Sequence, residues 1–229
     1  QFVQEKLGYP IYNLNGEASL FTPEGMINPK ATIGNVYGDY YLQPDNWYDE
    51  LFNSGNLRQE YNVRISGASE KSTYYMSAGY LDDQGIIPNS GFKRFTLRAN
   101  SDYQVTNFLK VGTNLSYSNS VNKTPRDQVG SSSGNLFYIS NMIAPVYPLY
   151  VRNADGSIKI DEHGYTVYDF GAGEYNGLGR PFLGNSNPAS MIALDKQEYN
   201  YDVVSARAFA TLDIYKGLKA TANWGLDLD

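Results

Sequence analysis

The chain has 229 residues, a formal net charge of −6, no cysteine, 21 tyrosines and 22 glycines. The acidic balance argues against a nucleic-acid partner, which requires a basic surface, and the lack of cysteine excludes disulfides and thiolate metal sites. A mean hydropathy of −0.45, without any apolar stretch as long as a spanning helix, argues against a helical inner-membrane protein.

Residues 1–57 are predicted to form a long surface loop, which we expect to be extracellular. Prolines and glycines recur through this stretch, with aromatic residues scattered between them. A helical turn is expected at 46–52.

Residues 58–120 are predicted to form four strands, because apolar and polar residues alternate along them. In the third strand, at about 91–104, the two faces are Phe95, Leu97, Ala99 and Tyr103 against Arg94, Thr96, Arg98, Asn100 and Asp102. A period of two indicates a strand with one dry face and one wet face.

Residues 121–198 form an insertion that is too long to be a structureless loop within a compact domain, so we expect it to be functional. It contains a Ser/Gly hinge at 130–134, a predicted short helix at 135–143, a hairpin turn at 154–157 and a helical turn at 188–194. The alternation resumes at 199–229, which predicts two more strands.

Three features favour a membrane barrel over a soluble β-sandwich. The apolar faces hold many alanines, the polar faces hold Arg, Asn and Asp in mid-strand, and aromatic residues gather near strand ends. Those aromatic residues are Tyr61, Tyr74, Tyr80, Tyr103, Tyr117, Tyr199, Tyr201 and Tyr215. The predicted fold is all-β: an antiparallel transmembrane β-barrel segment of about six strands with long extracellular loops.

The connections alternate between short and long, as they do in outer-membrane barrels. By that rule the short turns at 67–71, 104–107 and 215–218 face the periplasm, and the long loops face outside. About six strands cannot close a useful barrel, and the first residues lack the basic start and apolar core of a signal peptide. We therefore expect a slice of a longer polypeptide.

A run of motifs in the first strands resembles a known family. The segments YNVRISG at 61–67, SEKSTYY at 69–75 and SAGYLDDQGII at 77–87 closely resemble the SusC/RagA-like TonB-dependent transporters of Bacteroidetes outer membranes. The resemblance covers 46–120 firmly and the insertion with 199–229 more loosely.

The resemblance implies a larger barrel, of about 22 strands in this class of transporter, closed by a plug domain. It implies import of oligosaccharides or oligopeptides through the outer membrane. It also implies two partners, a SusD-like surface lipoprotein that acts as a lid and the TonB complex, which would act through the plug. The barrel wall would contact outer-membrane lipid.

The sequence contains no recognisable catalytic constellation, so we predict no enzymatic activity and no cofactor. The single histidine, His163, lies in a charged loop and is best interpreted as a solvated residue. Residues 153–156 do not match the spacing of an EF-hand and are read as a turn, which leaves a loop calcium site open.

Two sets of residues are candidates for contacts. The insertion carries aromatic side chains that could contact the substrate or the lid, although each could instead hold the loop together: Tyr147, Tyr150, Tyr165, Tyr168, Phe170 and Phe182. Arg94, Arg98 and Arg207 are expected to face the lumen, where they could clamp a carboxylate. The stronger interpretation pairs them with the plug or with Asp102 and Asp213.

Two alternative functions remain open from the sequence. One is a passive outer-membrane porin or adhesin, which would lack the plug and the lid. The other is a soluble β-rich module that binds glycans.

Overall fold

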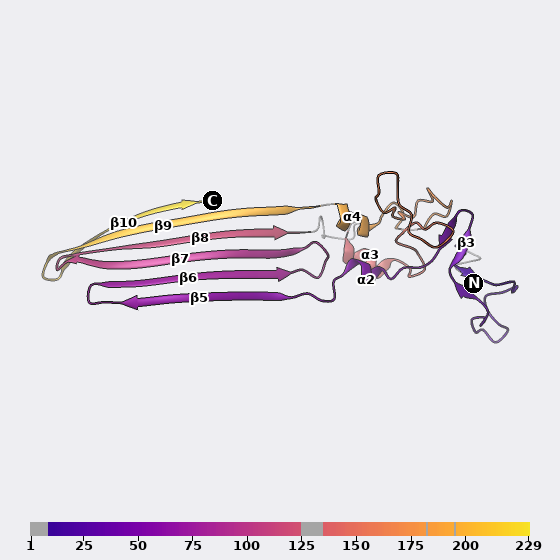
Figure 1. Cartoon of the computed structure of the whole chain (residues 1–229), viewed down its shortest axis with the longest axis horizontal. Helices are drawn as coiled ribbons and strands as arrows, with labels where there is room; N and C mark the ends of the chain where they lie inside the picture. Colours follow the sequence, from indigo (N-terminus) through magenta and orange to yellow (C-terminus); the bar gives the residue numbers. More distant parts are fainter. Residues whose placement is uncertain (1–8, 125–134, 182, 195) are drawn as a thin grey trace. The chain divides into compact units, whose positions relative to one another are not determined.

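The chain folds into two compact units. The computed structural model describes residues 9–124, 135–181, 183–194 and 196–229 (Figure 1). The sheet unit comprises 54–124 and 196–229, and the loop unit comprises the described residues of 1–53 and 125–195. The predicted hinge at 130–134 and Phe182 lie outside the described residues.

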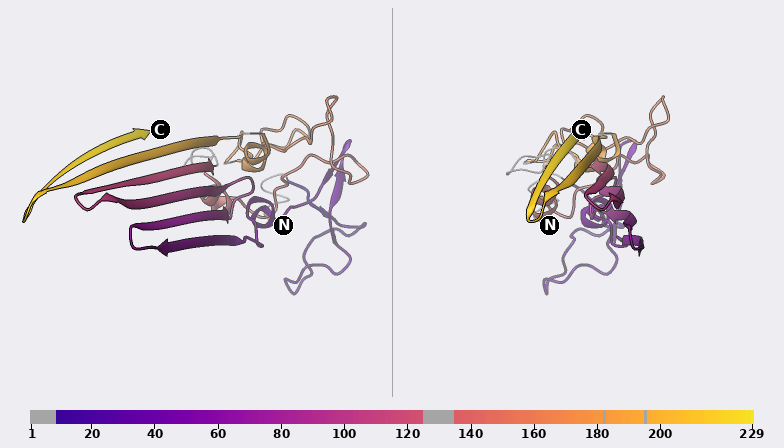
Figure 2. Two further views of the ribbon diagram at one scale, coloured as in Figure 1. Left: turned by 60° about the vertical axis from the view of Figure 1, so that its left-hand side comes forward. Right: turned by 90° about the vertical axis from the view of Figure 1, so that its left-hand side faces the viewer.

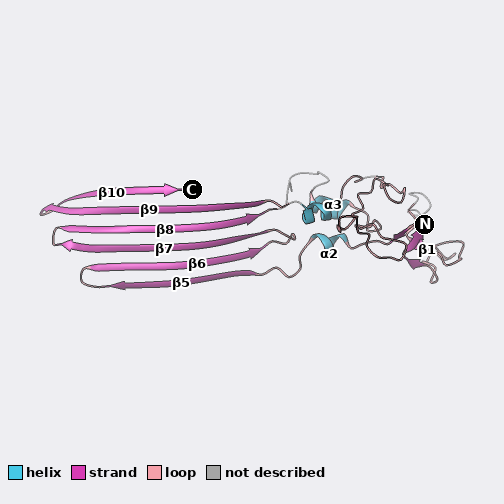
Figure 3. Cartoon of the chain, turned by 45° about the horizontal axis from the view of Figure 1, so that its top comes forward, coloured by secondary structure: helices cyan, strands magenta, loops and turns pink. Residues whose placement is uncertain are grey.

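The sheet unit is a six-stranded antiparallel meander in which each strand pairs with its neighbour in sequence (Figure 3). Its strands are β5 (Arg58–Ala68), β6 (Ser72–Gln84), β7 (Gly91–Thr106), β8 (Leu109–Lys123), β9 (Glu198–Tyr215) and β10 (Leu218–Leu228). β8 and β9 pair from Leu109 opposite Leu212 to Lys123 opposite Glu198, so the insertion between them leaves their ladder intact. The expected fold class is confirmed, and the sheet is open.

All six strands are long enough to cross a bilayer. They contain 11 to 18 residues, against roughly 9–11 needed for a tilted transmembrane strand. The hairpin of β9 and β10 extends past the other short turns (Figure 2). Gly217, with φ of 84°, occupies the left-handed position of its turn.

The register places opposite chemistry on the two faces of the sheet. One cross-strand row is apolar throughout: Val63, Ala78, Leu97, Tyr117, Val204 and Leu228. The next row along is polar throughout: Arg64, Ser77, Arg98, Ser116, Ser205 and Asp227. Side chains on the apolar face are uncovered, with Val63 63% exposed and Leu115 50% exposed. An apolar surface of this extent needs an apolar environment.

Polar and aromatic residues border the apolar face at both ends. At one end Lys93 forms an ion pair of 3.0 Å with Asp82, and at the other lie Tyr74 and Tyr103. From Lys93 to Tyr103 is a rise of ~33 Å along the strand, or ~25 Å of height at a tilt of ~40°, which matches the apolar band of outer-membrane barrels.

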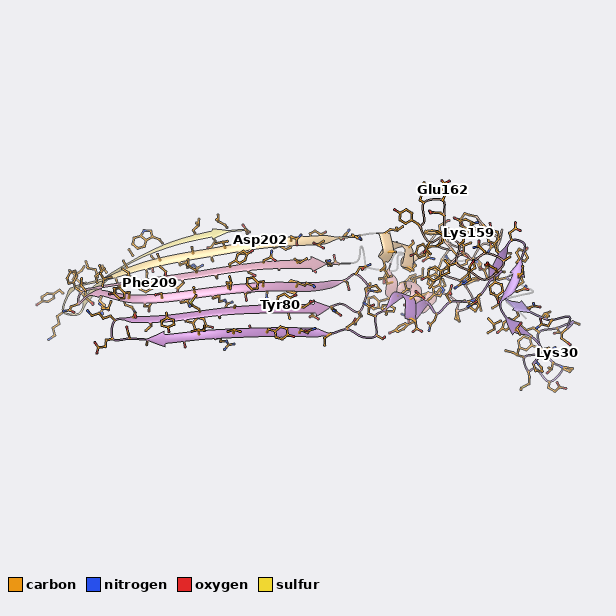
Figure 4. The ribbon with its side chains drawn as sticks, in the orientation of Figure 1. Lys30, Tyr80, Lys159, Glu162, Asp202 and Phe209 are labelled. Atoms are coloured by element: carbon orange, nitrogen blue, oxygen red, sulfur yellow. The ribbon has the colours of Figure 1, made fainter. Side chains whose placement is uncertain are left out.

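Figure 4 shows where three labelled residues lie along the sheet. Tyr80 and Asp202 lie toward the end that leads to the long connections, and Phe209 lies near the short turns. Asp202 accepts hydrogen bonds from the Tyr117 hydroxyl at 2.7 Å and from Asn119 at 2.9 Å, so this carboxylate is satisfied on the apolar face.

The loop unit is built from short elements of two distant chain segments. The first segment supplies β1 (Tyr12–Asn13), β2 (Thr32–Ile33), β3 (Asn35–Tyr37), β4 (Tyr40–Leu42) and α2 (Trp47–Leu51), and the second supplies α3 (Leu136–Met142) and α4 (Pro188–Leu194). The three helices match the predicted ones. Asn46 and Asn135 cap α2 and α3, since each side-chain oxygen accepts a backbone N–H of the first turn.

Between α3 and α4, three short segments around Val151, Lys159 and Val167 form a closed ring of backbone hydrogen bonds. The N–H of Val151 donates to the carbonyl of Val167, that of Val167 to Lys159, and that of Lys159 to Val151, at 2.8 to 3.0 Å. Two hairpin loops connect these segments, with Gly156 and Gly164 at φ of 87° and 86°. The sequence predicted only the first hairpin. No helix among the described residues is long and apolar enough to cross a membrane.

The two faces of β8 and β9 should differ in their tolerance of charge. Leu115→Arg and Ala208→Arg put a charge on the apolar face and should each destabilise the folded barrel by about 2–4 kcal/mol near the bilayer midplane. Ser116→Arg, on the polar face of the same strand, is the matched control and should cost much less. Refolding the complete barrel into lipid vesicles measures both, and equal costs on the two faces would contradict the orientation.

Candidate functional site

A buried ion pair joins the two segments of the loop unit. The carboxylate of Asp45 accepts hydrogen bonds from Arg152 Nη1 at 3.0 Å and Nη2 at 2.5 Å, and from the N–H of Leu149 at 2.8 Å. The side chains of both charged residues are about a tenth exposed. A bidentate pair with its remaining lone pairs satisfied is the geometry in which a buried ion pair is tolerated.

Trp47 makes the second connection between the segments. Its indole N–H donates to the carbonyl of Tyr147 at 2.8 Å, and the ring is almost fully buried. Leu51 from the same helix and Leu149 from the insertion are also fully buried. The first segment therefore contributes side chains to the core around which the insertion folds.

A buried arginine and aspartate lie in the same core. The guanidinium of Arg180 lies 5.5 Å from the centroid of the Trp47 ring and donates to the carbonyl of Ser186 at 2.7 Å. Burial raises the pKa of Asp169 despite the N–H of Gly171 and the charge of Arg180, and it lowers the pKa of Arg180. Gly171, with φ of 74°, leaves the space that Arg180 Nε occupies.

Asn187 completes this network and begins α4, as the sequence predicted. Its side-chain amide donates to the carbonyls of Leu149 and Asp169 at 2.8 and 2.9 Å, and its oxygen accepts from the N–H of Ala189 at 3.1 Å. The loop unit is thus a well-connected small fold. Among the described residues, no group of three or more His, Cys, Asp or Glu side chains is placed to hold a metal ion.

The predicted aromatic residues fall into different environments. Tyr147 is 1% exposed and packs edge-on against Tyr9 at 5.1 Å between ring centroids, so in this conformation its side chain belongs to the core. The Tyr150 hydroxyl donates to Glu50 at 2.7 Å, and its ring lies 5.6 Å from that of Tyr168. Burial, together with this hydrogen bond, raises the pKa of Tyr150, which keeps it a neutral donor.

Tyr165 and Phe170 are more accessible. Tyr165 is 63% exposed and follows the hairpin loop that contains His163, while Phe170 is half-buried. Exposed Ile158 and Ile160 belong to the same ring of short segments. Contact of these residues with a substrate or a lid stays a prediction.

The predicted arginines lie on the polar face of the sheet, as the alternation required. Arg94 and Arg98 are exposed side chains of β7, and with Arg64 of β5 they line a hollow of about 320 Å³. Arg64 was missed in the sequence, although the alternation of 58–67 is the signal that could have found it. Arg207 lies 3.7 Å from Asp227.

The carboxylates that the sequence paired with these arginines have other partners. Asp102 lies 3.1 Å from Lys110, and Asp213 lies 2.9 Å from Lys219. The predicted pairing of lumen arginines with Asp102 and Asp213 is therefore wrong, because the register brings a lysine of the adjacent strand closer to each carboxylate.

An exposed sheet face of apolar residues, backed by a charged polar face, defines a segment of a transmembrane β-barrel. The chain is 28% identical over 201 residues to TonB-dependent receptor P3 of Formosa agariphila, which covers 85% of this chain and 18% of that protein. It is 30% identical over 105 residues to TonB-dependent receptor SusC of Bacteroides thetaiotaomicron, covering 45% of this chain and 10% of SusC.

The solved RagAB peptide transporter has a similar fold. Its TM-score is 0.55 at 21% identity, over 80% of this chain and 19% of that one. No protein-family model matches the chain. The chain is similar to the TonB-dependent receptors, SusC among them, and the similarity covers only part of each relative. It spans about a fifth of the length of these relatives, or less.

Breaking the buried ion pair should loosen the loop unit without affecting the sheet. Asp45→Ala leaves Arg152 buried without its partner and should destabilise this unit by about 3–5 kcal/mol. Hydrogen exchange on the complete protein should then be faster at the backbone N–H groups of 149–152 and unchanged in β5–β10. Lys30→Gln, which removes an exposed ion pair with Glu17, is the control and should change neither. Unaltered exchange at 149–152 in Asp45→Ala would show that the pair does not hold the segments together.

Proposed function

We propose that the protein containing this chain is an outer-membrane, TonB-dependent importer of oligosaccharides or oligopeptides. The apolar face of the sheet contacts lipid and the polar face lines the lumen. The short turns that join β5 to β6, β7 to β8 and β9 to β10 face the periplasm. The loop unit, whose segments precede β5 and connect β8 to β9, is extracellular.

The observation that carries this proposal is the alternation of the two cross-strand rows. The row through Leu97 is apolar across all six strands, and the row through Arg98 is polar across all six. A soluble sheet with one uncovered apolar face would aggregate, whereas a barrel wall needs this arrangement. The similarity to TonB-dependent receptors supports energised import over a passive pore.

The proposed partners are a SusD-like lipoprotein lid and the TonB complex, which acts through a plug domain. The SusC-like relatives support both partners. The fold neighbour is described as a peptide transporter, which supports oligopeptides as one substrate class, and the exposed aromatic residues of the loop unit suit sugars equally well.

Energised uptake tests the proposal directly. Cells that carry the complete transporter should accumulate a labelled mixture of oligosaccharides and oligopeptides, and deletion of the transporter should abolish the accumulation of at least one class. Collapse of the proton-motive force with a protonophore should have the same effect as the deletion. Uptake that persists after the collapse would indicate a passive porin instead.

We assign residues 150–168, which contain the three hydrogen-bonded segments of the ring, to contact with the lid. Replacing Ile158, Ile160 and Tyr165 by serine removes exposed apolar area and should weaken co-purification of the lid without lowering the amount of barrel. Met26→Ser, at a 69% exposed position of the first segment, is the control. Undiminished co-purification of the lid with the triple variant would refute this assignment.

A further inference from the structure

Three arginines of the sheet stand apart from its other basic side chains. The other basic residues on the strands lie within ion-pair distance of a carboxylate: Arg58, Lys93, Lys110, Lys123, Arg207 and Lys219. Among the residues that the structure describes, Arg64, Arg94 and Arg98 have no carboxylate at that distance. The sheet thus neutralises its positive charges except on one area of its polar face.

The register explains why these three side chains share a hollow. Arg64 on β5 and Arg98 on β7 both lie opposite Ser77 on β6, so their backbones are two strand spacings apart, or ~10 Å. Arg94 lies four residues before Arg98 on the same face, ~13 Å along the strand. A guanidinium reaches far enough from its backbone for all three to border one hollow of about 320 Å³.

The rest of the lining supplies hydrogen-bonding groups and no negative charge. It consists of amide, hydroxyl and aromatic side chains together with one glycine: Asn62, Tyr75, Ser77, Gly79, Thr96, Ser116 and Ser118. Tyr117 also borders the hollow, but its hydroxyl donates to Asp202 on the apolar face. Gly79 leaves room for the Asn62 and Thr96 side chains. A Cβ at this position would lie only 2.8 Å from Asn62 Oδ1 and from Thr96 Oγ1.

Guanidinium groups without a carboxylate are suited to oxyanions. Each presents N–H donors in a fixed fork that matches the two oxygens of a carboxylate or sulfate. Three like charges around one hollow also repel one another, so an anion among them is stabilised by all three.

We propose that this hollow binds the carboxylate or sulfate groups of the imported solute, which makes the transported molecule an acidic oligomer. The spread of charge over ~13 Å along β7 suits a ligand with repeated negative groups better than a single carboxylate. This inference rests on the proposed function, because it takes the polar face as the lumen of an importer.

Retention of matched probes by the purified complete transporter tests the inference. The probes are two pairs of equal size: oligogalacturonates with their carboxyl-reduced, neutral counterparts, and glutamate-containing tetrapeptides with their glutamine counterparts. Mass spectrometry of the retained molecules gives the ratio of acidic to neutral member in each pair. In the wild-type protein, the acidic member of at least one pair should be retained about ten times more than the neutral member, as expected when a charge-assisted hydrogen bond is present.

The variant Arg64→Gln/Arg98→Gln should bring the ratio toward one. Lys110→Gln/Lys219→Gln is the matched control, since it removes the same charge from the same face but from residues that already have carboxylate partners. It should leave the ratio unchanged.

Three results would overturn the inference. They are equal retention of acidic and neutral members, no retention of either member of both pairs, and an acidic preference that survives in the Arg64/Arg98 variant. The first is also the result expected if an acidic segment of the same polypeptide fills the hollow. Neutral probes that are retained and taken up with energy would leave the importer proposal intact while the anion inference fails.

Discussion

The cross-strand register of the sheet is the constraint on which the rest of the molecule depends. A shift of one residue between any two strands would move every side chain of one strand to the opposite face. Leu97 and Arg98 are adjacent in sequence, yet Leu97 lies in an apolar cross-strand row and Arg98 in a polar one, and both rows cross all six strands. The backbone ladder therefore converts a local alternation into a surface for lipid and a surface for water.

This division of the faces also determines where charge can collect. Lys110 and Lys219 reach carboxylates on neighbouring strands, so the short-turn end of the polar face is neutralised. Nearer the middle of the sheet the residues opposite Arg98 are serines on both sides, which satisfy hydrogen bonds but not charge. The open positive area follows from that choice of neighbours, and the proposed binding of acidic solutes rests on this open area.

The sequence predicted the sheet well because strand alternation is a local property. The faces of Phe95 and Arg98 could be read from their own strand, and the short helices could be read from Asn and Pro at their starts. The ion pair of Asp45 with Arg152 could not be predicted, because the partners are 107 residues apart and no local pattern around either one indicates the other. For the same reason, the sequence did not indicate that the two long connections fold together into one unit. It also explains the wrong partners for Asp102 and Asp213, since choosing among nearby lysines requires the register.

Spin labels placed one at a time at positions 113–118 of β8, in the complete transporter in lipid bilayers, measure the central claim most directly. Oxygen dissolves in the hydrocarbon and a nickel chelate stays in water, so their relaxation of each label reports which face the side chain occupies. The account predicts that labels at 113, 115 and 117 respond to oxygen and that labels at 114, 116 and 118 respond to the chelate. A response without a period of two, or with the two sets exchanged, would contradict the assignment of lipid and lumen faces.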